Sequence, residues 1–275
     1  MIGRNDAVEL LGLTYKEFDN YFRKSGEIKG EKVKNRWTFD EEELRRWEML
    51  RKERTVRLSL AEYEKCFEFA IKMAYSSHSS HGTGIRGARS EVQVADDFIL
   101  GILAEEGVAK FLGKKFGAEI GLDHEAHPDH ITPQDFLTIS RDGITRPVKL
   151  DVAVKSSKMK SCFNIIRPNE YEIERRRSDI YIFARVGLPS DHLFRILRDH
   201  SFFRKVSDFL ESSEDYRKIE ELGDITVWIC GFSFHGEFES VEEIPGQKFD
   251  GYRYVKSVAD MHNSDGDWED FISKL

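Results

Sequence analysis

Apolar residues recur along this chain at two different periods. Between Glu91 and about Leu112 they follow helical spacing, with Phe98 and Ile102 on one face, and Ser90 can cap that long helix. Shorter runs have the alternating or continuous apolar pattern of strands. These runs are Phe136 to Ser140, Val148 to Lys155, Asp179 to Val186 and Ile225 to Phe234. Further helices are predicted over Glu170 to Arg177, over Phe202 to Glu211 and from Trp268, so the body is an α/β fold with a mixed sheet flanked by helices.

The first 56 residues have a different organisation. A short amphipathic helix ends at Gly12, and Thr14 can cap a second helix from Tyr15 to Lys24. Glu27 to Phe39 alternates about a glycine turn and predicts a hairpin, after which Asp40 can cap a third helix. We therefore expect a small unit over 1–56, a connecting helix with a Ser/Gly-rich segment over 57–90, and a larger domain over 91–275.

This order of helix, turn, helix, basic hairpin and helix resembles the winged helix-turn-helix domains of the excisionase and MerR type. The matching segments are Ala7 to Thr14, Ser25 to Ile28 and Arg36 to Phe39. The resemblance implies a second helix that enters the major groove of DNA and a basic wing, with Lys34 and Arg36, that contacts the backbone. The same unit could instead serve only for packing or dimerisation.

Composition and charge set limits on function. The chain has 275 residues, is 40% hydrophobic and carries a net charge of −8, which argues against indiscriminate binding of nucleic acid. Its three cysteines, Cys66, Cys162 and Cys230, are widely spaced and predict buried thiols. No apolar run approaches the ~18 to 20 residues of a membrane span, and the N-terminus lacks a signal pattern. We expect a cytoplasmic protein without a membrane partner.

The basic residues are concentrated near the middle of the chain. Lys149 to Lys160 contains four lysines against the single acid Asp151, and three arginines follow at 175–177. Acidic residues concentrate instead over 211–221 and 265–270. A basic centre within an acidic periphery fits an enzyme that acts selectively on nucleic acid.

Two of the predicted strands carry chemistry at their ends. Asp135 directly precedes the first strand, and Lys155 closes the second. If Val148 to Lys155 is a strand, Asp151, Ala153 and Lys155 share a face, and Asp151 lies about 13 Å from Lys155. Pro128-Asp129 offers another acid, but the residues after Asp129 do not predict a strand, so we prefer Asp135.

An acid before one strand and a lysine at the end of the next resemble the PD-(D/E)xK nucleases, and among them the type II restriction endonucleases. The likeness extends over about Arg86 to Leu275 and includes the segments around Asn169, Trp228 and Trp268. It implies a restriction-endonuclease-like mixed sheet and a Mg²⁺ cofactor. By the same resemblance Asp135 is a metal-binding acid, and Lys155 orients the attacking water or stabilises charge on phosphorus.

The chain departs from this pattern at Ala153, where the family has a second acid. Alanine cannot bind a metal, so another carboxylate must complete the site. Glu91 at the start of the long helix and Asp151 are close alternatives for a catalytic and metal-binding role, followed by Glu170 after the lysine. Asp151 would need a strand bulge to reach the lysine.

The expected activity is Mg²⁺-dependent cleavage of double-stranded DNA at a specific sequence, by a homodimer that places one centre on each strand. A cognate DNA methyltransferase is expected in the same system. The residues expected to contact bases or phosphates are Lys158, Lys160, Arg175, Arg176 and Arg177, together with Lys34 and Arg36. The alternative is a transcriptional regulator whose α/β body is a non-catalytic effector or dimerisation module.

Overall fold

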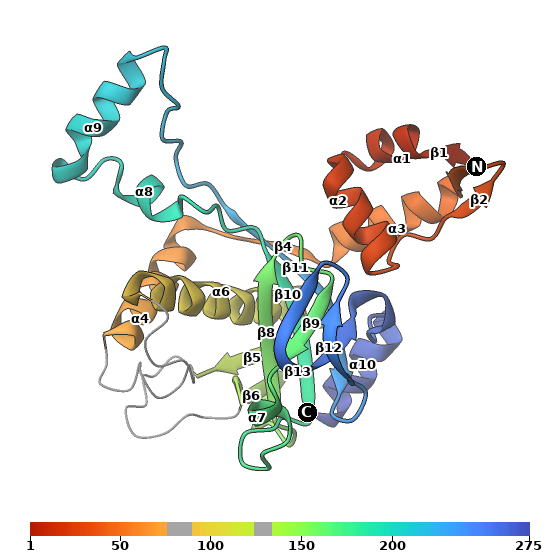
Figure 1. Cartoon of the computed structure of the whole chain (residues 1–275). Helices are drawn as coiled ribbons and strands as arrows, with labels where there is room; N and C mark the ends of the chain where they lie inside the picture. Colours follow the sequence, from red (N-terminus) through yellow and green to blue (C-terminus); the bar gives the residue numbers. More distant parts are fainter. Residues whose placement is uncertain (76–89, 124–133) are drawn as a thin grey trace.

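The computed structural model describes residues 1–75, 90–123 and 134–275 (Figure 1). Most of the Ser/Gly-rich segment that was predicted within 57–90 lies outside these residues, and so does the Pro128-Asp129 pair. The described residues form a mixed α/β structure, which confirms the predicted class. No helix among them is long and apolar enough to cross a membrane.

A four-stranded sheet lies at the centre of the body. Its strands, in spatial order, are β4 (Thr55–Leu58), β11 (Ile225–Phe234), β10 (Ile180–Val186) and β8 (Val152–Lys158). β8 and β10 are parallel, whereas β11 is antiparallel to both of its neighbours. Every residue of β10 is buried, as expected for a strand that is covered on both faces. β8 is the last strand of this sheet, so its outer edge has no strand partner within the sheet.

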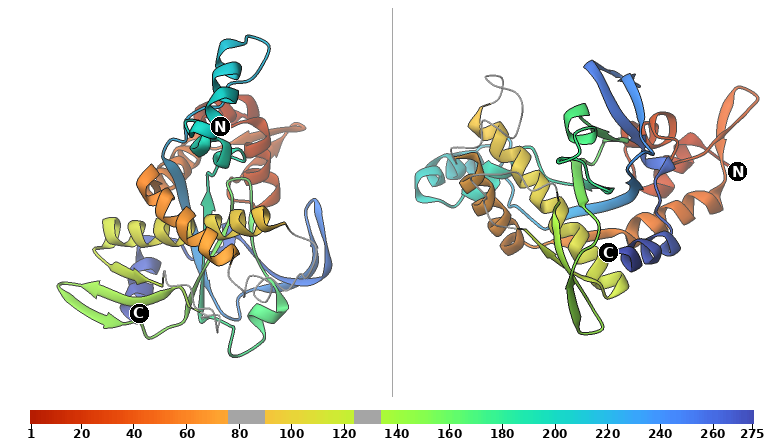
Figure 2. Two further views of the ribbon diagram at one scale, coloured as in Figure 1. Left: turned by 90° about the vertical axis from the view of Figure 1, so that its left-hand side faces the viewer. Right: turned by 90° about the horizontal axis from the view of Figure 1, so that it is seen from below.

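Helices cover one face of the central sheet (Figure 2). They are α4 (Leu60–Ala74), α6 (Glu91–Phe116) and α10 (Asp265–Lys274). α6 approaches β11 very closely, because a Cβ atom at Gly107 would lie only 2.5 Å from Cγ1 of Val227. This glycine therefore fixes how deeply the middle of α6 lies against the sheet.

The other face is covered in two parts. One part is a second sheet whose strands are β9 (Phe163–Ile166), β13 (Gln247–Ser257) and β12 (Glu239–Ile244). Ile166 of β9 packs in one cluster with Tyr171 of α7 (Pro168–Tyr171) and Tyr181 of β10. The N-terminal unit covers the remainder, where Phe183, Trp228 and Cys230 of the central sheet join its apolar core. A third sheet, β5–β6–β7, lies beyond the edge of β8; its strands are β5 (Glu119–Leu122), β6 (Phe136–Arg141) and β7 (Ile144–Pro147).

The N-terminal unit contains the predicted order of helix, helix, hairpin and helix, preceded by a two-residue strand that was not predicted. It comprises β1 (Ile2–Gly3), α1 (Arg4–Leu11), α2 (Tyr15–Asp19), the π-helical η1 (Asn20–Lys24), β2 (Glu31–Val33), β3 (Arg36–Phe39) and α3 (Glu41–Glu53). The hairpin turns at Lys34 and Asn35, which both have positive φ, and not at Gly30 as predicted. The glycine instead precedes β2, where a Cβ would lie 2.5 Å from the Phe39 ring.

A buried ion pair connects this unit to the central sheet. Arg185 of β10 is fully buried, and its Nη2 lies 2.6 Å from Oε1 of Glu27. Its Nε donates to the carbonyl oxygen of Ser161 at 2.6 Å, and its guanidinium lies over the Trp228 ring. The hydroxyl of Tyr21 also donates to the carbonyl oxygen of Met159. The unit is therefore fixed both to β10 and to the loop after β8.

Several boundaries differ from the predicted ones. The strand predicted over Val148 to Lys155 begins at Val152 and continues to Lys158. The helix predicted over Glu170 to Arg177 ends at Tyr171, and turns follow it. The predicted strands at β6, β10 and β11 and the helices α6, α9 (Ser201–Ser212) and α10 are confirmed within a few residues. α8 (His192–Leu197), the 3-10 helix η2 (Val258–Asp260) and the second sheet were not predicted.

Replacing Glu27 by alanine should leave the Arg185 guanidinium buried without a countercharge. We expect a loss of about 3–5 kcal/mol in the free energy of unfolding, measured by urea denaturation. The matched control is Asp19→Ala, which removes the partly exposed Arg4–Asp19 pair and should cost at most about 1 kcal/mol. Equal, small losses in both variants would contradict a supporting role for the buried pair.

Candidate active site

Asp135 occupies the outer edge of β8, where a neighbouring strand would otherwise lie. Its backbone N–H donates to the carbonyl oxygen of Val152 at 2.8 Å, and its Oδ2 accepts from the N–H of Val154 at 2.6 Å. Because both contacts involve backbone groups of one strand, the position of the carboxylate is fixed relative to β8. Asp135, which the sequence singled out, therefore lies beside β8, the strand that carries Lys155 and Lys158.

A second carboxylate reaches this place from α6. Glu105 lies in the middle of that helix, and its pKa is raised well above the ordinary range by burial and then by the nearby charge of Asp135. The charge of Lys155 opposes the shift. Glu105, Asp135 and Lys155 therefore act on one another electrostatically, although no two of them are close in the sequence.

Lys155 forms an ion pair with an acid on α7, which packs on the face of the central sheet that the second sheet covers. Its Nζ donates to Oε2 of Glu170 at 2.9 Å, and both side chains are partly exposed. Glu170 lies on α7, whose next residue, Tyr171, stacks on Tyr254 with ring centroids 3.9 Å apart. The aromatic packing of Tyr171 thus fixes the short helix that presents the partner of Lys155.

Burial sets the protonation of Asp135. Desolvation raises the pKa of this carboxyl to about 6, and the charge of Asp123 adds to the increase. The hydrogen bond from Val154 and the charge of Lys155 oppose it without cancelling it. Asp123, which follows β5, also raises the pKa of Glu105. Burial and neighbouring acids therefore both favour the protonated forms of Asp135 and Glu105.

Ala153 explains why the acid expected beside Lys155 is absent from β8. Its side chain is buried in the aromatic cluster of Ile166, Tyr171, Tyr181 and Phe238. A carboxylate at this position would lose its hydration without gaining a partner. The acid whose charge interacts with Lys155 and Asp135 instead lies on α6, as Glu105.

Two of the other predicted acids lie away from Lys155. Glu91 is exposed in the first turn of α6, fourteen residues and about 21 Å along the helix from Glu105. Asp151 precedes β8 at about 13 Å along the strand from Lys155, and its pKa is raised by burial and by Asp179. Of the three candidates for the missing acid, only Glu170 contacts Lys155, and it does so as an ion-pair partner.

The predicted basic residues fall into separate groups. Lys158 and Lys160 are exposed at the carboxyl end of β8, and the charge of Lys160 acts on Glu17 of the N-terminal unit. Arg175, Arg176 and Arg177 are exposed in the turns that lead to the opposite end of β10. The strand between these groups has seven residues, which corresponds to about 23 Å. Lys34 and Arg36 lie on the exposed hairpin of the N-terminal unit.

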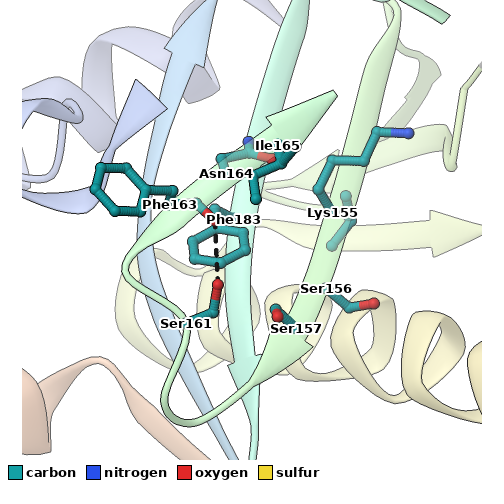
Figure 3. A pocket seen from close by; sticks show the side chains of 9 residues that line it. Lys155, Ser156, Ser157, Ser161, Phe163, Asn164, Ile165 and Phe183 are labelled. Atoms are coloured by element: carbon teal, nitrogen blue, oxygen red, sulfur yellow. Dashed lines mark hydrogen bonds between the residues drawn. The ribbon is translucent and has the colours of Figure 1, made fainter. Parts of the chain in front are cut away.

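A pocket of about 230 Å³ adjoins Lys155 on the side of β9 (Figure 3). Ser157, Ser161 and Asn164 contribute polar groups to its lining, and Phe183 forms part of its wall. In Figure 3 the amine of Lys155 points away from Ser161 and Phe163. The aliphatic part of the Lys155 side chain therefore lines the pocket, while its amine points away from the pocket and contacts Glu170.

Sequence reasoning missed Glu105, although a signal was present. Phe98, Ile102, Glu105 and Leu112 follow one another at helical spacing, so the acid interrupts an apolar stripe. An acid in such a stripe is expected to be buried and to have a pKa-shifted or functional role. Within the described residues, however, no group of three or more His, Cys, Asp or Glu side chains is arranged to bind a metal ion.

Comparison of the chain with protein-family models, with curated proteins and with solved structures gave no match. Its functional interpretation therefore depends on the geometry of the site and on the motifs in the sequence.

Asp135→Asn should stabilise the protein at neutral pH. The folded protein retains the Asp135 proton up to about pH 6, whereas the unfolded chain releases it near 3.8. The free energy of unfolding therefore falls as the pH rises from about 3.8 to about 6 and stays lower above that range. We expect the variant to gain roughly 1–2 kcal/mol at pH 7.5 and nothing at pH 4, measured by urea denaturation without metal. A variant that is less stable than the parent at pH 7.5 would contradict the raised pKa.

The burial of Ala153 can be tested with two substitutions of similar size. Ala153→Asp should be less stable than Ala153→Asn by about 2 kcal/mol or more at pH 7.5, because only the aspartate buries a charge. The difference should shrink as the pH falls and the carboxylate is protonated. If the two variants unfold alike at pH 7.5, position 153 is open to solvent and could accept the acid.

Proposed function

We propose that this protein is a Mg²⁺-dependent endodeoxyribonuclease that cuts double-stranded DNA, with a core of the restriction-endonuclease type. The observation that carries the proposal is that Asp135 is held against the outer edge of β8, the strand that carries Lys155, while the charges of Asp135 and Lys155 both act on Glu105 of α6. Two acids and a lysine at one strand edge are the groups that metal-assisted phosphodiester hydrolysis needs. The acid that β8 lacks at Ala153 is supplied by α6.

The donors present suit magnesium better than a metal that needs a closed protein cage. Mg²⁺ prefers oxygen ligands and is often bound by one or two carboxylates together with water and substrate phosphate. Asp135 and Glu105 would be such a pair. Burial raises the pKa of both carboxyls, and the charge of Asp135 adds to the increase at Glu105. A magnesium ion bound here would polarise the scissile phosphate and lower the pKa of an attacking water.

Each side chain has a defined task in this arrangement. The Val154 N–H orients Asp135, so the carboxylate remains in place when substrate arrives. Glu105 provides charge from the helix layer. Lys155 supplies a positive charge for the phosphate or the attacking water, and Glu170 holds its ammonium group at the site before DNA binds.

Exposed cations indicate where the DNA backbone would lie. Lys158 and Lys160 adjoin the N-terminal unit, whose helical segment ends with the exposed Arg23 and Lys24. Together with the Lys34 to Arg36 hairpin they offer phosphate contacts on one side of Lys155, and Arg175 to Arg177 offer them on the other. The fixed contact between the N-terminal unit and β10 would keep these groups in register with the site.

The proposed activity implies partners. Cutting both strands of a symmetric sequence requires two centres, so a homodimer is the proposed assembly. A DNA methyltransferase that protects the host sequence would accompany an enzyme of the restriction type.

Lys155→Ala and Glu105→Gln should each lower Mg²⁺-dependent cleavage by at least about 100-fold while DNA binding persists. Cleavage is measured on sequenced plasmid and genomic DNA, methylated and unmethylated, and binding by gel shift in Ca²⁺. The matched controls are Glu91→Gln, on the same helix as Glu105, and Asp151→Asn, before the same strand as Lys155. Both controls should retain cleavage.

The outcomes distinguish the activity from the site. Absence of cleavage by the parent protein on every substrate, combined with specific DNA binding, would favour the transcriptional regulator. Cleavage by the parent that persists in Lys155→Ala would show a nuclease with its centre elsewhere. Loss in Glu91→Gln but not in Glu105→Gln would assign the second acid to the start of α6.

A further inference from the structure

A helical arm with an exposed apolar surface extends from the body. The arm, defined here as residues 191–221, contains α8 and α9, which lie away from the central sheet in Figure 1. Six of the seventeen exposed large apolar side chains among the described residues belong to it: Phe194, Leu197, Phe202, Val206, Phe209 and Tyr216. Such a concentration on one short segment marks an interaction surface.

The exposed residues of α9 lie on one side of the helix. Phe202, Val206 and Phe209 are spaced by four and three residues and are 87%, 47% and 56% exposed. We call these three residues the α9 stripe. The opposite side faces the rest of the arm, where Ser207 donates to the carbonyl oxygen of Arg198 and Phe203 stacks on Phe194. The rest of the arm therefore leaves most of the α9 stripe exposed, although the Phe209 ring also lies 5.5 Å from the Tyr216 ring.

The arm is attached to the body by buried polar contacts. His192, at the first residue of α8, lies between the Tyr63 hydroxyl at 2.6 Å and Oδ1 of Asp96 at 2.7 Å. Farther out, Arg195 pairs with Asp191 and with Glu220, which connects the two sides of the arm. These contacts give the arm a defined conformation in which the α9 stripe stays exposed.

The charges beside the α9 stripe are suited to a second copy of the same helix. Lys205 lies in the first half of α9 and Asp208 in the second, and neither takes part in an ion pair among the described residues. When two such helices pair antiparallel about a two-fold axis, Lys205 of each lies beside Asp208 of the other. The partly positive N-terminal end of each helix then lies beside the partly negative C-terminal end of the other, which is favourable.

The size of the surface agrees with a stable pairing. With about 150–250 Å² for a fully exposed aromatic side chain, the three residues of the α9 stripe expose on the order of 300 Å² per copy. A standard interface buries about 800 Å² per partner. The apolar centre of an interface of that size is therefore already present on the arm.

We propose that the arms of two copies of this chain pair antiparallel through their α9 stripes and form a homodimer. This inference deepens the proposed function by naming the surface that would bring two centres together. The inference rests on the proposed function only for its purpose. Its test needs neither DNA nor metal, so the proposed dimer and the proposed nuclease activity can be refuted separately.

The first experiment measures mass in solution by sedimentation velocity. The parent protein should have twice the 32.0 kDa mass of the chain. The double variant that combines Phe202→Glu and Phe209→Glu should raise the dimer dissociation constant by on the order of 100-fold or more. The matched control is Ile144→Glu, since Ile144 is 68% exposed on β7 and should not affect the mass. Circular dichroism checks that each variant is folded.

The second experiment tests the geometry. Val206→Cys should form an intermolecular disulfide under mild oxidation, because Val206 lies near the proposed two-fold axis and the native thiols are buried. Ile144→Cys should not. Lys205→Glu and Asp208→Lys should each weaken the dimer severalfold, and their combination, or a mixture of the two variants, should restore it. A monomeric parent, or a dimer unaffected by the double glutamate variant and by charge reversal, would overturn the proposal.

Discussion

The buried Arg185 guanidinium joins three parts of the molecule that the chain itself keeps far apart. It belongs to the central strand β10 and donates both to the Glu27 carboxylate of the N-terminal unit and to the Ser161 carbonyl oxygen after β8. A buried cation requires all of its partners at once, since removing any of them leaves an unpaired polar group. The N-terminal unit, the central sheet and the basic loop are therefore held in one relative position.

Local signals predicted most of the central elements and few of the peripheral ones. β10 and β11 are long apolar runs, and α6 and α10 are strongly capped, so their burial and their boundaries are specified within the segment itself. β12 and β13 are largely polar and exposed hairpin strands, and β9 has only four residues. Their conformation depends on pairing with distant segments, which the sequence pattern of each strand does not reveal.

The candidate site shows the same division. Asp135 and Lys155 could be found because each adjoins a recognisable strand. The sequence marks Glu105 only as an acid within an apolar stripe, and the packing of α6 decides that Glu105, and not Glu91, is buried within reach of the charge of Asp135. Gly107 contributes to that choice, since the close approach to Val227 brings the middle of the helix, and not its start, against the sheet.

Helix α6 connects the arm with the site. It carries Asp96, the acceptor for the root of the arm, and nine residues later Glu105, a separation of about 14 Å along one rigid rod. The position of a partner bound to the arm would therefore be fixed relative to α6, the helix that also carries Glu105 of the candidate site. In the proposed dimer, the contact between His192 and Asp96 would fix each candidate site relative to the paired arms, and would thereby fix the distance between the two sites.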